Sequence, residues 1–184
     1  PAASNKMPVR VFKHSGTKIE SISFRGKPQE ELLQFYVQNL ARIFRTTNPQ
    51  KENAFQNFLI NNGTLNLIVA TAKIEKHDHI VEVGPGLGIL TQELLKYAGK
   101  VSSIELDPQM IRILKERLLD PKLEIFQMDA LFFEPPKTPY KVVANIPYNI
   151  TSPIINHFLQ RENKPSSLTL LVQKEVADRI CLRE

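Results

Sequence analysis

Three glycines at alternate positions form the first group of residues that could do chemistry. They lie in Glu82-Val83-Gly84-Pro85-Gly86-Leu87-Gly88, between a predicted strand and a predicted helix. Glycine lets the backbone approach a ligand closely, and the N-terminus of the following helix offers free N–H groups to it. The spacing is Gly-x-Gly-x-Gly, and the third glycine of the dinucleotide fingerprint would fall at Ile89. The segment therefore predicts a nucleotide-type site but argues against a nicotinamide or flavin cofactor.

Two carboxylates follow the next two predicted strands. Glu105 ends the strand 101–106, where an acidic side chain can accept hydrogen bonds from both hydroxyls of a ribose. Asp129 comes just after the strand 123–127, where it could accept a hydrogen bond from an adenine amino group. Each also has an ordinary interpretation, since carboxylates are common at strand ends and in turns. Because ligands of open α/β sheets bind at the carboxyl ends of strands, the three features together predict an adenosine-containing cofactor.

The segment Asn145-Ile146-Pro147-Tyr148 follows the predicted strand 141–144 and carries the most specific signal. The exocyclic amine of a base is a poor nucleophile because its lone pair is delocalised into the ring. The side-chain carbonyl of Asn145 and the backbone carbonyl of Pro147 could accept its two N–H groups and favour the geometry of attack, while Tyr148 could stack on the extruded base. A plain turn would use the same residue types. At a fourth strand end, after a Gly-x-Gly-x-Gly turn, the segment predicts catalysis on a base amine.

Regularly alternating strands and helices position these residues, beginning at about residue 63. Asp107-Pro108 provides an N-cap and a first-turn proline for one of the helices. Strands separated by crossover helices indicate an α/β fold with a mostly parallel sheet and helices on both faces, so that the carboxyl ends of the strands share one edge. The predicted strands are 79–83, 101–106, 123–127, 141–144 and 168–172, and the predicted helices are 64–74, 89–97, 107–119 and 153–160.

The N-terminal third differs from the rest of the chain in charge. Residues 1–52 hold nine Lys/Arg against four Asp/Glu, whereas residues 53–184 hold fifteen of each, so the whole formal charge of +5 lies in the first segment. Alternating residues in 9–12 and 19–24 predict a hairpin there, followed by a helix from Pro28. A basic extension beside a neutral domain suits a polyanionic partner, although a solvated positive surface would have the same composition. We leave the role of this extension open.

Composition excludes several classes of protein. The 184 residues are enough for one domain and an appendage, and apolar residues make up 42%. No stretch reaches the roughly 18–20 apolar residues of a membrane-spanning helix, and the N-terminus lacks the apolar core of a signal peptide. Cys181 is the single cysteine and the four histidines lack metal-ligand spacing, so neither a disulfide framework nor a metal site is expected. We therefore predict a cytoplasmic protein that contacts no membrane.

The complete set of motifs resembles the ribosomal RNA adenine N6,N6-dimethyltransferases of the KsgA type. The resemblance runs from about residue 53 to residue 184, and the order and spacing of its motifs are highly specific. It implies a Rossmann-like class I S-adenosylmethionine-dependent methyltransferase fold, with the last strands and a C-terminal helical domain lacking. The matching strings are 56–59, 81–88, 104–107, 129–130, 143–153 and 172–180.

The resemblance implies S-adenosylmethionine as the methyl donor. The implied acceptors are two adjacent adenines near the 3′ end of small-subunit rRNA, in the immature small ribosomal subunit, and we expect a monomer. Asn57 and Leu59 would contact the methionine end of the cofactor. The sulfonium is already a good leaving group, so catalysis is mostly alignment and needs no metal and no general base of shifted pKa. The implied cofactor-binding residues are Asn57, Leu59, Gly84, Glu105, Asp129 and Asn145, and the implied catalytic residues are Asn145, Pro147 and Tyr148.

The chain departs from the family pattern at three points. Phe55 stands where the family usually has glycine before its Gln-Asn-Phe-Leu string. Residues 1–52 do not resemble the short basic lead of the family. The family continues beyond the position of Glu184 with a strand pair that completes the sheet and a small helical RNA-binding domain. We therefore expect this chain to be a fragment.

Two alternative functions remain open. The sister group of the family methylates one adenine of large-subunit rRNA and confers macrolide resistance, but the strings 151–153 and 173–177 favour the small-subunit type. A non-catalytic nucleic-acid-binding factor could also use this scaffold. Intact Asn145 and Tyr148, together with the cofactor positions, argue against that second alternative.

Overall fold

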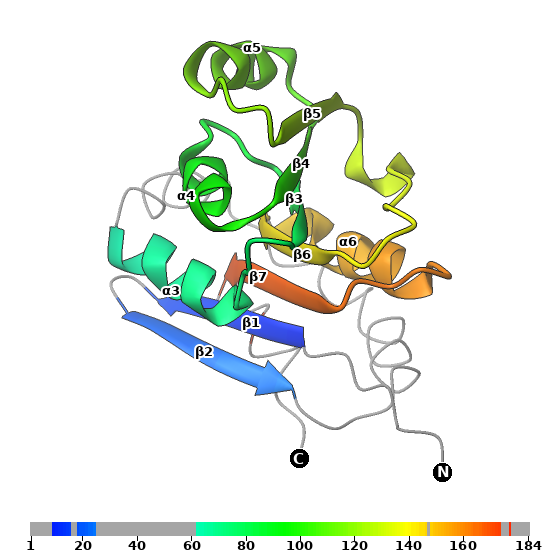
Figure 1. Cartoon of the computed structure of the whole chain (residues 1–184). Helices are drawn as coiled ribbons and strands as arrows, with labels where there is room; N and C mark the ends of the chain where they lie inside the picture. The colour runs from blue at the N-terminus through cyan, green and yellow to red at the C-terminus, as the bar shows by residue number, and fades with distance from the viewer. Residues whose placement is uncertain (1–8, 16–17, 25–61, 147, 174–176, 178–184) are drawn as a thin grey trace.

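The computed structural model describes residues 9–15, 18–24, 62–146, 148–173 and 177, which are drawn in colour in Figure 1. Its strands form one seven-stranded sheet in the order β2-β1-β7-β6-β3-β4-β5. The strands are β1 (Val9–Ser15), β2 (Lys18–Phe24), β3 (His79–Val83), β4 (Lys100–Glu105), β5 (Leu123–Gln127), β6 (Lys141–Asn145) and β7 (Ser167–Gln173). The helices are α3 (Asn62–Ala72), α4 (Ile89–Tyr97), α5 (Pro108–Arg117), the 3-10 turn η2 (Ala130–Phe132) and α6 (Tyr148–Gln160).

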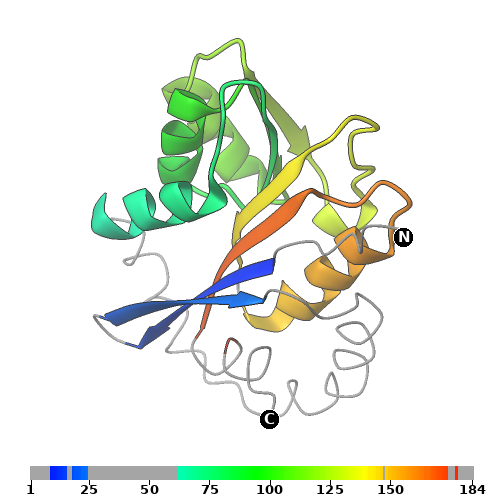
Figure 2. The same ribbon diagram turned by 60° about the horizontal axis from the view of Figure 1, so that its bottom comes forward.

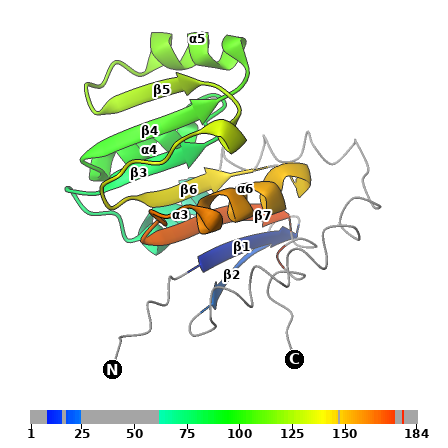
Figure 3. The ribbon, with the colours of Figure 1, turned by 90° about the vertical axis from the view of Figure 1, so that its right-hand side faces the viewer.

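Alternating side chains along the strands build a core on each face of the sheet. On β3, Ile80 belongs to the core shared with α3 and α4, whereas Val81 belongs to the core shared with α6. On β6, Val143 and Val142 divide between the two cores in the same way. Figure 3 shows α6 in front of the sheet and α4 behind it. Burial of both faces is typical of a parallel sheet, because successive side chains of a strand point to opposite faces.

The five strands from β3 to β7 pair in parallel and confirm the predicted α/β sheet. Strands β3 and β5 have the predicted bounds, β6 ends one residue later than predicted, and β4 and β7 differ from prediction by one residue at each end. The predicted C-terminal ends of α3 and α5 both lie two residues beyond the ends that the structure shows. The left-handed backbone of Lys73, with φ of 48°, follows the end of α3, and the extended backbone of Leu118 ends α5 at Arg117.

Helix α6 is longer than predicted. We expected it to begin at Pro153, because proline is favoured in the first turn of a helix, but it begins at Tyr148 and holds Pro153 in its interior. A proline there removes only one backbone hydrogen bond, the one to the carbonyl of Asn149. Packing of Ile150 and Ile154 into the core on either side of the proline stabilises the helix. The predicted start of α6 was wrong because it relied on the position of the proline, whereas the packing of the helix into the core determines where it begins.

The N-terminal hairpin is part of the same sheet. Strands β1 and β2 pair antiparallel, as predicted for this segment. Strand β1 also pairs in parallel with β7, from Val9 opposite Leu168 to His14 opposite Gln173, and Figure 2 shows the hairpin lying beside β7. The hairpin therefore extends the parallel sheet beyond β7. The helix predicted from Pro28 lies outside the described residues.

Candidate active site

The carboxyl ends of neighbouring strands bring four of the predicted site residues to one edge of the sheet. Strand β3 lies between β4 and β6, and its last residue, Val83, is level with the residues that precede Glu105 on β4 and Asn145 on β6. Gly84 follows Val83 directly. Strand β5 pairs with β4, and Asp129 comes two residues after β5 ends. The structure thus confirms that these four residues share one edge, as the parallel sheet predicted.

The loop between β3 and α4 uses backbone conformations that favour glycine. Gly84, Gly86 and Gly88 have φ angles of 69°, 53° and 79°, in the left-handed region where a Cβ strains the chain. The N–H of Gly84 donates to the carbonyl of Ile104 at 3.0 Å, which anchors the loop on β4, and the N–H of Gly88 donates to the carbonyl of Pro85 at 2.9 Å. Gly84 is exposed. The loop therefore presents bare backbone at the site edge, directly before the first turn of α4.

Helix α5 braces this loop from the side. A Cβ on Gly88 would lie 2.6 Å from Cδ2 of Leu114 and 2.9 Å from Cδ1 of Leu118, so only glycine allows α5 to approach this closely. Arg117, the last residue of α5, donates a hydrogen bond of 2.8 Å to the carbonyl of Leu87. Sequence reasoning missed Arg117, because a single basic residue at a helix end carries no local signal of a distant partner.

Both carboxylate oxygens of Glu105 already accept backbone hydrogen bonds. Oε1 accepts from the N–H of Leu106 at 2.8 Å and from the N–H of Asp107 at 3.0 Å. Oε2 accepts from the N–H of Gly86 at 3.2 Å. A carboxylate has about four acceptor positions, so Glu105 retains the capacity to accept from a ligand. Its side chain is fixed at the end of β4 and is joined to the glycine loop.

Asp129 is held in the turn after β5. Its Oδ1 accepts a hydrogen bond of 2.9 Å from the N–H of Leu131 and so caps η2. This is the ordinary turn role that the sequence also allowed. The second carboxylate oxygen is available to accept from a ligand, because one backbone N–H occupies only part of the acceptor capacity of the group. The capping bond therefore orients the side chain and is compatible with a cofactor role.

Asn145 presents a buried acceptor at the same edge. It is the last residue of β6, and its Oδ1 is buried and accepts no hydrogen bond from any residue that the structure describes. Its backbone carbonyl lies 3.6 Å from the position that a Cβ on Gly84 would take, so the two strand ends are in contact. A buried acceptor without a donor costs free energy of about 1–3 kcal/mol. Such an atom is suited to accept a hydrogen bond from a ligand, for example from an amino group.

The structure does not describe the side chains of four further site residues that the sequence predicts. Asn57, Leu59 and Pro147 lie outside the described residues. Tyr148 is the first residue of α6, directly after the edge that holds Asn145, but its side chain also lies outside what the structure describes. The roles of these four residues remain predictions.

Glu82 is a functional candidate that the sequence analysis did not single out. It is 1% exposed on β3, and its Oε2 accepts hydrogen bonds from the hydroxyls of Thr91 and Ser103, each at 2.7 Å. Burial raises the pKa of the Glu82 carboxyl to about 7; the two hydroxyls oppose this rise, and the nearby Glu105 adds to it. A signal was available in the sequence, since Glu82 is the one acidic residue in the otherwise apolar run that ends β3.

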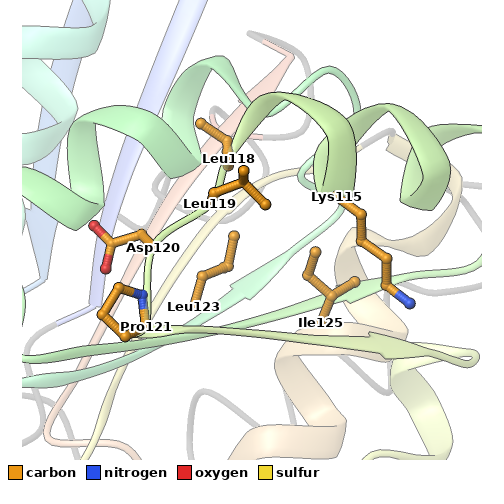
Figure 4. A pocket seen from close by; sticks show the side chains of 7 residues that line it. All are labelled: Lys115, Leu118, Leu119, Asp120, Pro121, Leu123 and Ile125. Atoms are coloured by element: carbon orange, nitrogen blue, oxygen red, sulfur yellow. The ribbon is translucent and has the colours of Figure 1, made fainter.

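Other features of the described residues lie apart from this edge. A pocket of about 410 Å³ opens between the end of α5 and strand β5 (Figure 4), where Leu118, Leu123 and Ile125 supply apolar walls and Lys115 stands at the side.

Within the described ranges, no three His, Cys, Asp or Glu side chains are grouped as metal ligands. None of the helices described there has the length and apolar character needed to cross a bilayer.

A family model described as ribosomal RNA adenine dimethylase matches residues 47–183, most of the chain. The chain belongs to this family. The match includes all the strands and helices from α3 to β7 and all the residues of the site edge. The β1–β2 hairpin lies outside the matched range.

Curated relatives of this chain carry the name ribosomal RNA small subunit methyltransferase A. The protein from Dehalococcoides mccartyi is 45% identical over 131 residues, which cover 68% of this chain and 45% of the relative. The protein from Clostridium botulinum is 43% identical over 135 residues, which cover 70% of this chain and 49% of the relative. The chain therefore spans about half the length of the curated relatives it matches.

Two solved structures confirm the predicted class I methyltransferase fold. A dimethyladenosine transferase from Plasmodium falciparum is 37% identical with a TM-score of 0.62, covering 67% of this chain and 46% of that one. The 23S rRNA methyltransferase ErmE is 34% identical with a TM-score of 0.57, covering 64% of this chain and 48% of that one. The sheet edge that holds Gly84, Glu105 and Asn145 is thus part of a fold shared with rRNA methyltransferases.

Proposed function

We propose that this chain carries the methyl-transferring domain of an rRNA adenine N6-methyltransferase that uses S-adenosylmethionine and acts on two adjacent adenines near the 3′ end of small-subunit rRNA. The observation that carries the proposal is the buried Oδ1 of Asn145, which has no hydrogen-bond donor among the described residues, on a strand end whose backbone contacts the exposed Gly84. The names of the curated relatives support the small-subunit substrate. The immature small subunit is the proposed partner, and the proposed setting is a monomer in the cytoplasm.

The residues of the site edge fit an adenosine-containing methyl donor. Gly84 leaves its backbone bare for close approach, and Glu105 has about one acceptor position left for a ribose hydroxyl. Asp129 supports this fit, because its second oxygen can accept from the adenine amino group. When bound, S-adenosylmethionine supplies a methyl group on a sulfonium centre that needs no further activation as a leaving group. Asn57 and Leu59 are proposed for the methionine end.

The protein contributes mainly by positioning the target amine. Asn145 Oδ1 is fixed at the end of a buried strand, and its lack of a donor within the described structure leaves it free to accept an N–H of the target amine. The backbone carbonyl of Pro147 would accept the second N–H, and Tyr148 would stack on the base. Two fixed acceptors orient the amine lone pair for attack, an effect that acts through alignment.

A large-subunit substrate is the second candidate. Its support is the likeness of the chain to the 23S rRNA methyltransferase ErmE at 34% identity. The small-subunit assignment is favoured because the curated relatives with that name are 43–46% identical over two thirds of the chain. Residues 53–184 would carry the chemistry on either substrate, and residues 1–52 would add the hairpin that extends the sheet.

An Asn145→Ala variant tests the proposed function. Transfer of tritiated methyl groups to immature small subunits should be lost, while affinity for the RNA should stay within about twofold, because Asn145 acts on the amine and not on the phosphate backbone. Asn156→Ala is the matched control, since Asn156 on α6 also has a buried Oδ1 without a described partner. The assay is run on the 184-residue chain and on the product of the complete gene. Full activity of Asn145→Ala would refute the mechanism, and transfer to large-subunit RNA alone would favour the second candidate.

A further inference from the structure

The buried carboxyl of Glu82 has no role in the alignment described above, although it lies at the base of the glycine loop. Its neighbours in the sheet are Ser103 on β4 and Val143 on β6, and Thr91 reaches it from α4. Within the described structure, Glu105 is the charged group that acts on it. Oε1 of Glu82 is buried without any described hydrogen-bond partner. A carboxyl group in these surroundings is costly to ionise.

We propose that Glu82 is a positioning residue that senses the charge of the cofactor, and that its ionised form favours S-adenosylmethionine over the uncharged product S-adenosylhomocysteine. The proposal rests on the proposed function, since it assumes that this edge binds the methyl donor. Among the described residues, Glu82 is linked to the two ends of the glycine loop, by its hydrogen bond with Thr91 in the first turn of α4 and by the strand that leads into Gly84. It therefore acts through its charge and through the loop.

Glu105 lies on β4, the strand that pairs with β3, the strand of Glu82. The negative charge of Glu105, on the neighbouring strand, adds to the burial that raises the pKa of Glu82. A positive charge at the same edge acts in the opposite direction and favours the ionised carboxylate. The sulfonium sulfur is bonded to the 5′ carbon of the ribose that Glu105 is proposed to bind. Three ribose carbons, C3′, C4′ and C5′, therefore separate the sulfonium from the 3′ hydroxyl that Glu105 is proposed to bind.

The two cofactor forms differ in charge at this point. S-adenosylmethionine carries a sulfonium in addition to its ammonium and carboxylate groups, whereas S-adenosylhomocysteine has a neutral thioether. Binding of the sulfonium form should lower the pKa of Glu82 from about 7 and release a proton near neutral pH. Binding of the neutral thioether form should leave the pKa of Glu82 unchanged. Loss of the methyl group should therefore lower the affinity of the site for the product.

Calorimetric titration with each cofactor form, from pH 6 to pH 8, tests this proposal. For the unmodified chain, affinity for S-adenosylmethionine should rise with pH by about tenfold for each unit by which the sulfonium lowers the Glu82 pKa, and affinity for S-adenosylhomocysteine should change less. Repeating the titration in phosphate and in Tris measures the released proton directly. Glu82→Gln keeps an oxygen for Thr91 and Ser103 but cannot ionise, so the difference between the two profiles should disappear.

A second variant and a control separate charge sensing from a structural effect. Ser103→Ala removes a hydrogen bond that favours the ionised form, so the midpoint of the S-adenosylmethionine profile should move to higher pH. Glu116→Gln changes an exposed carboxyl on α5 and should leave both profiles as in the unmodified chain. A pH-dependent preference that persists in Glu82→Gln would overturn the proposal alone. Failure of the unmodified chain to bind either cofactor form would overturn the cofactor assignment, and the proposal with it.

Discussion

The backbone N–H of Gly86 donates a hydrogen bond of 3.2 Å to Oε2 of Glu105, which joins the glycine loop to the end of the neighbouring strand. The other oxygen of Glu105 accepts from the two residues that follow it. The glycine loop and the acidic strand end therefore form one connected unit. A substitution at Glu105 changes a proposed ribose acceptor and an anchor of the loop at the same time.

Replacing Glu105 should weaken binding of S-adenosylmethionine. For Glu105→Ala we expect a loss of about 1.5–3 kcal/mol, the usual range for hydrogen bonds to a charged group. Glu105→Gln keeps one acceptor oxygen and should lose less. Calorimetry measures both values, and Glu124→Gln on the exposed face of β5 is the control, because Glu124 pairs with Lys100 away from the site edge. Unchanged affinity in Glu105→Ala would remove Glu105 from the cofactor site.

Two glycines of the loop should respond differently to alanine. At Gly88 the new Cβ would collide with Leu114 and Leu118, so Gly88→Ala should lower the free energy of unfolding by about 2–4 kcal/mol from overpacking and left-handed strain together. At Gly84 the nearest atom is 3.6 Å away, so only the backbone strain of about 1–2 kcal/mol remains. Urea unfolding measures both. Gly84→Ala should have the larger effect on cofactor affinity, and equal stability losses would contradict the role assigned to α5.

Stability should depend on pH through Glu82. Because the folded-state pKa is about 7 and the ordinary value is 4.5, the folded chain holds a proton between these values that the unfolded chain has lost. The contribution of Glu82 to stability is therefore fully present below pH 4.5 and declines as pH rises to about 7, by about 3 kcal/mol in total. Glu82→Gln does not titrate, so its stability relative to the unmodified chain should increase by most of that amount, about 2.5 kcal/mol, from pH 5 to pH 8. Parallel pH profiles from urea unfolding would disprove the raised pKa.

The basic residues outside the hairpin allow a test of RNA contact that leaves the sheet intact. We expect that glutamine at Lys6, Arg25, Lys27, Arg42, Arg45 and Lys51 would reduce the salt dependence of RNA binding. Each lost phosphate contact should reduce the slope of log affinity against log salt by about 0.7–0.9. Lys115→Gln and Lys137→Gln, both exposed in the neutral part of the chain, are the controls. Identical slopes would show that the basic extension does not contact phosphates.

The sequence predicted those parts of the structure that depend on local pattern and on parallel topology. Runs of apolar residues located β3 and β5 to the residue, and the shared edge of a parallel sheet follows from the alternation of strands and helices. The start of α6 was missed because Pro153 gives a strong local signal, whereas the packing that keeps it inside a helix is tertiary.

The unpredicted contacts all depend on pairs that are distant in the sequence. Arg117 bonds to the carbonyl of Leu87, and the state of Glu82 depends on Thr91 and Ser103 from two other elements. The residues that neighbour Arg117 and Glu82 in the sequence do not indicate which distant residues bond to them. The pairing of β1 with β7 is of the same kind, since the alternating pattern predicted a hairpin but no position for it.

The pairing of β1 with β7 also has a consequence for the order of folding. Val9 lies opposite Leu168, so β1 can dock only after β7 has also been synthesised, a delay on the order of ten seconds at ribosomal rates. The hairpin itself can close within microseconds. Contacts of such high sequence separation slow the final step, because the entropy of a long closed loop is lost before the pairing forms. We expect β1 and β7 to acquire protection from hydrogen exchange last during refolding, after the strands on either side of the glycine loop.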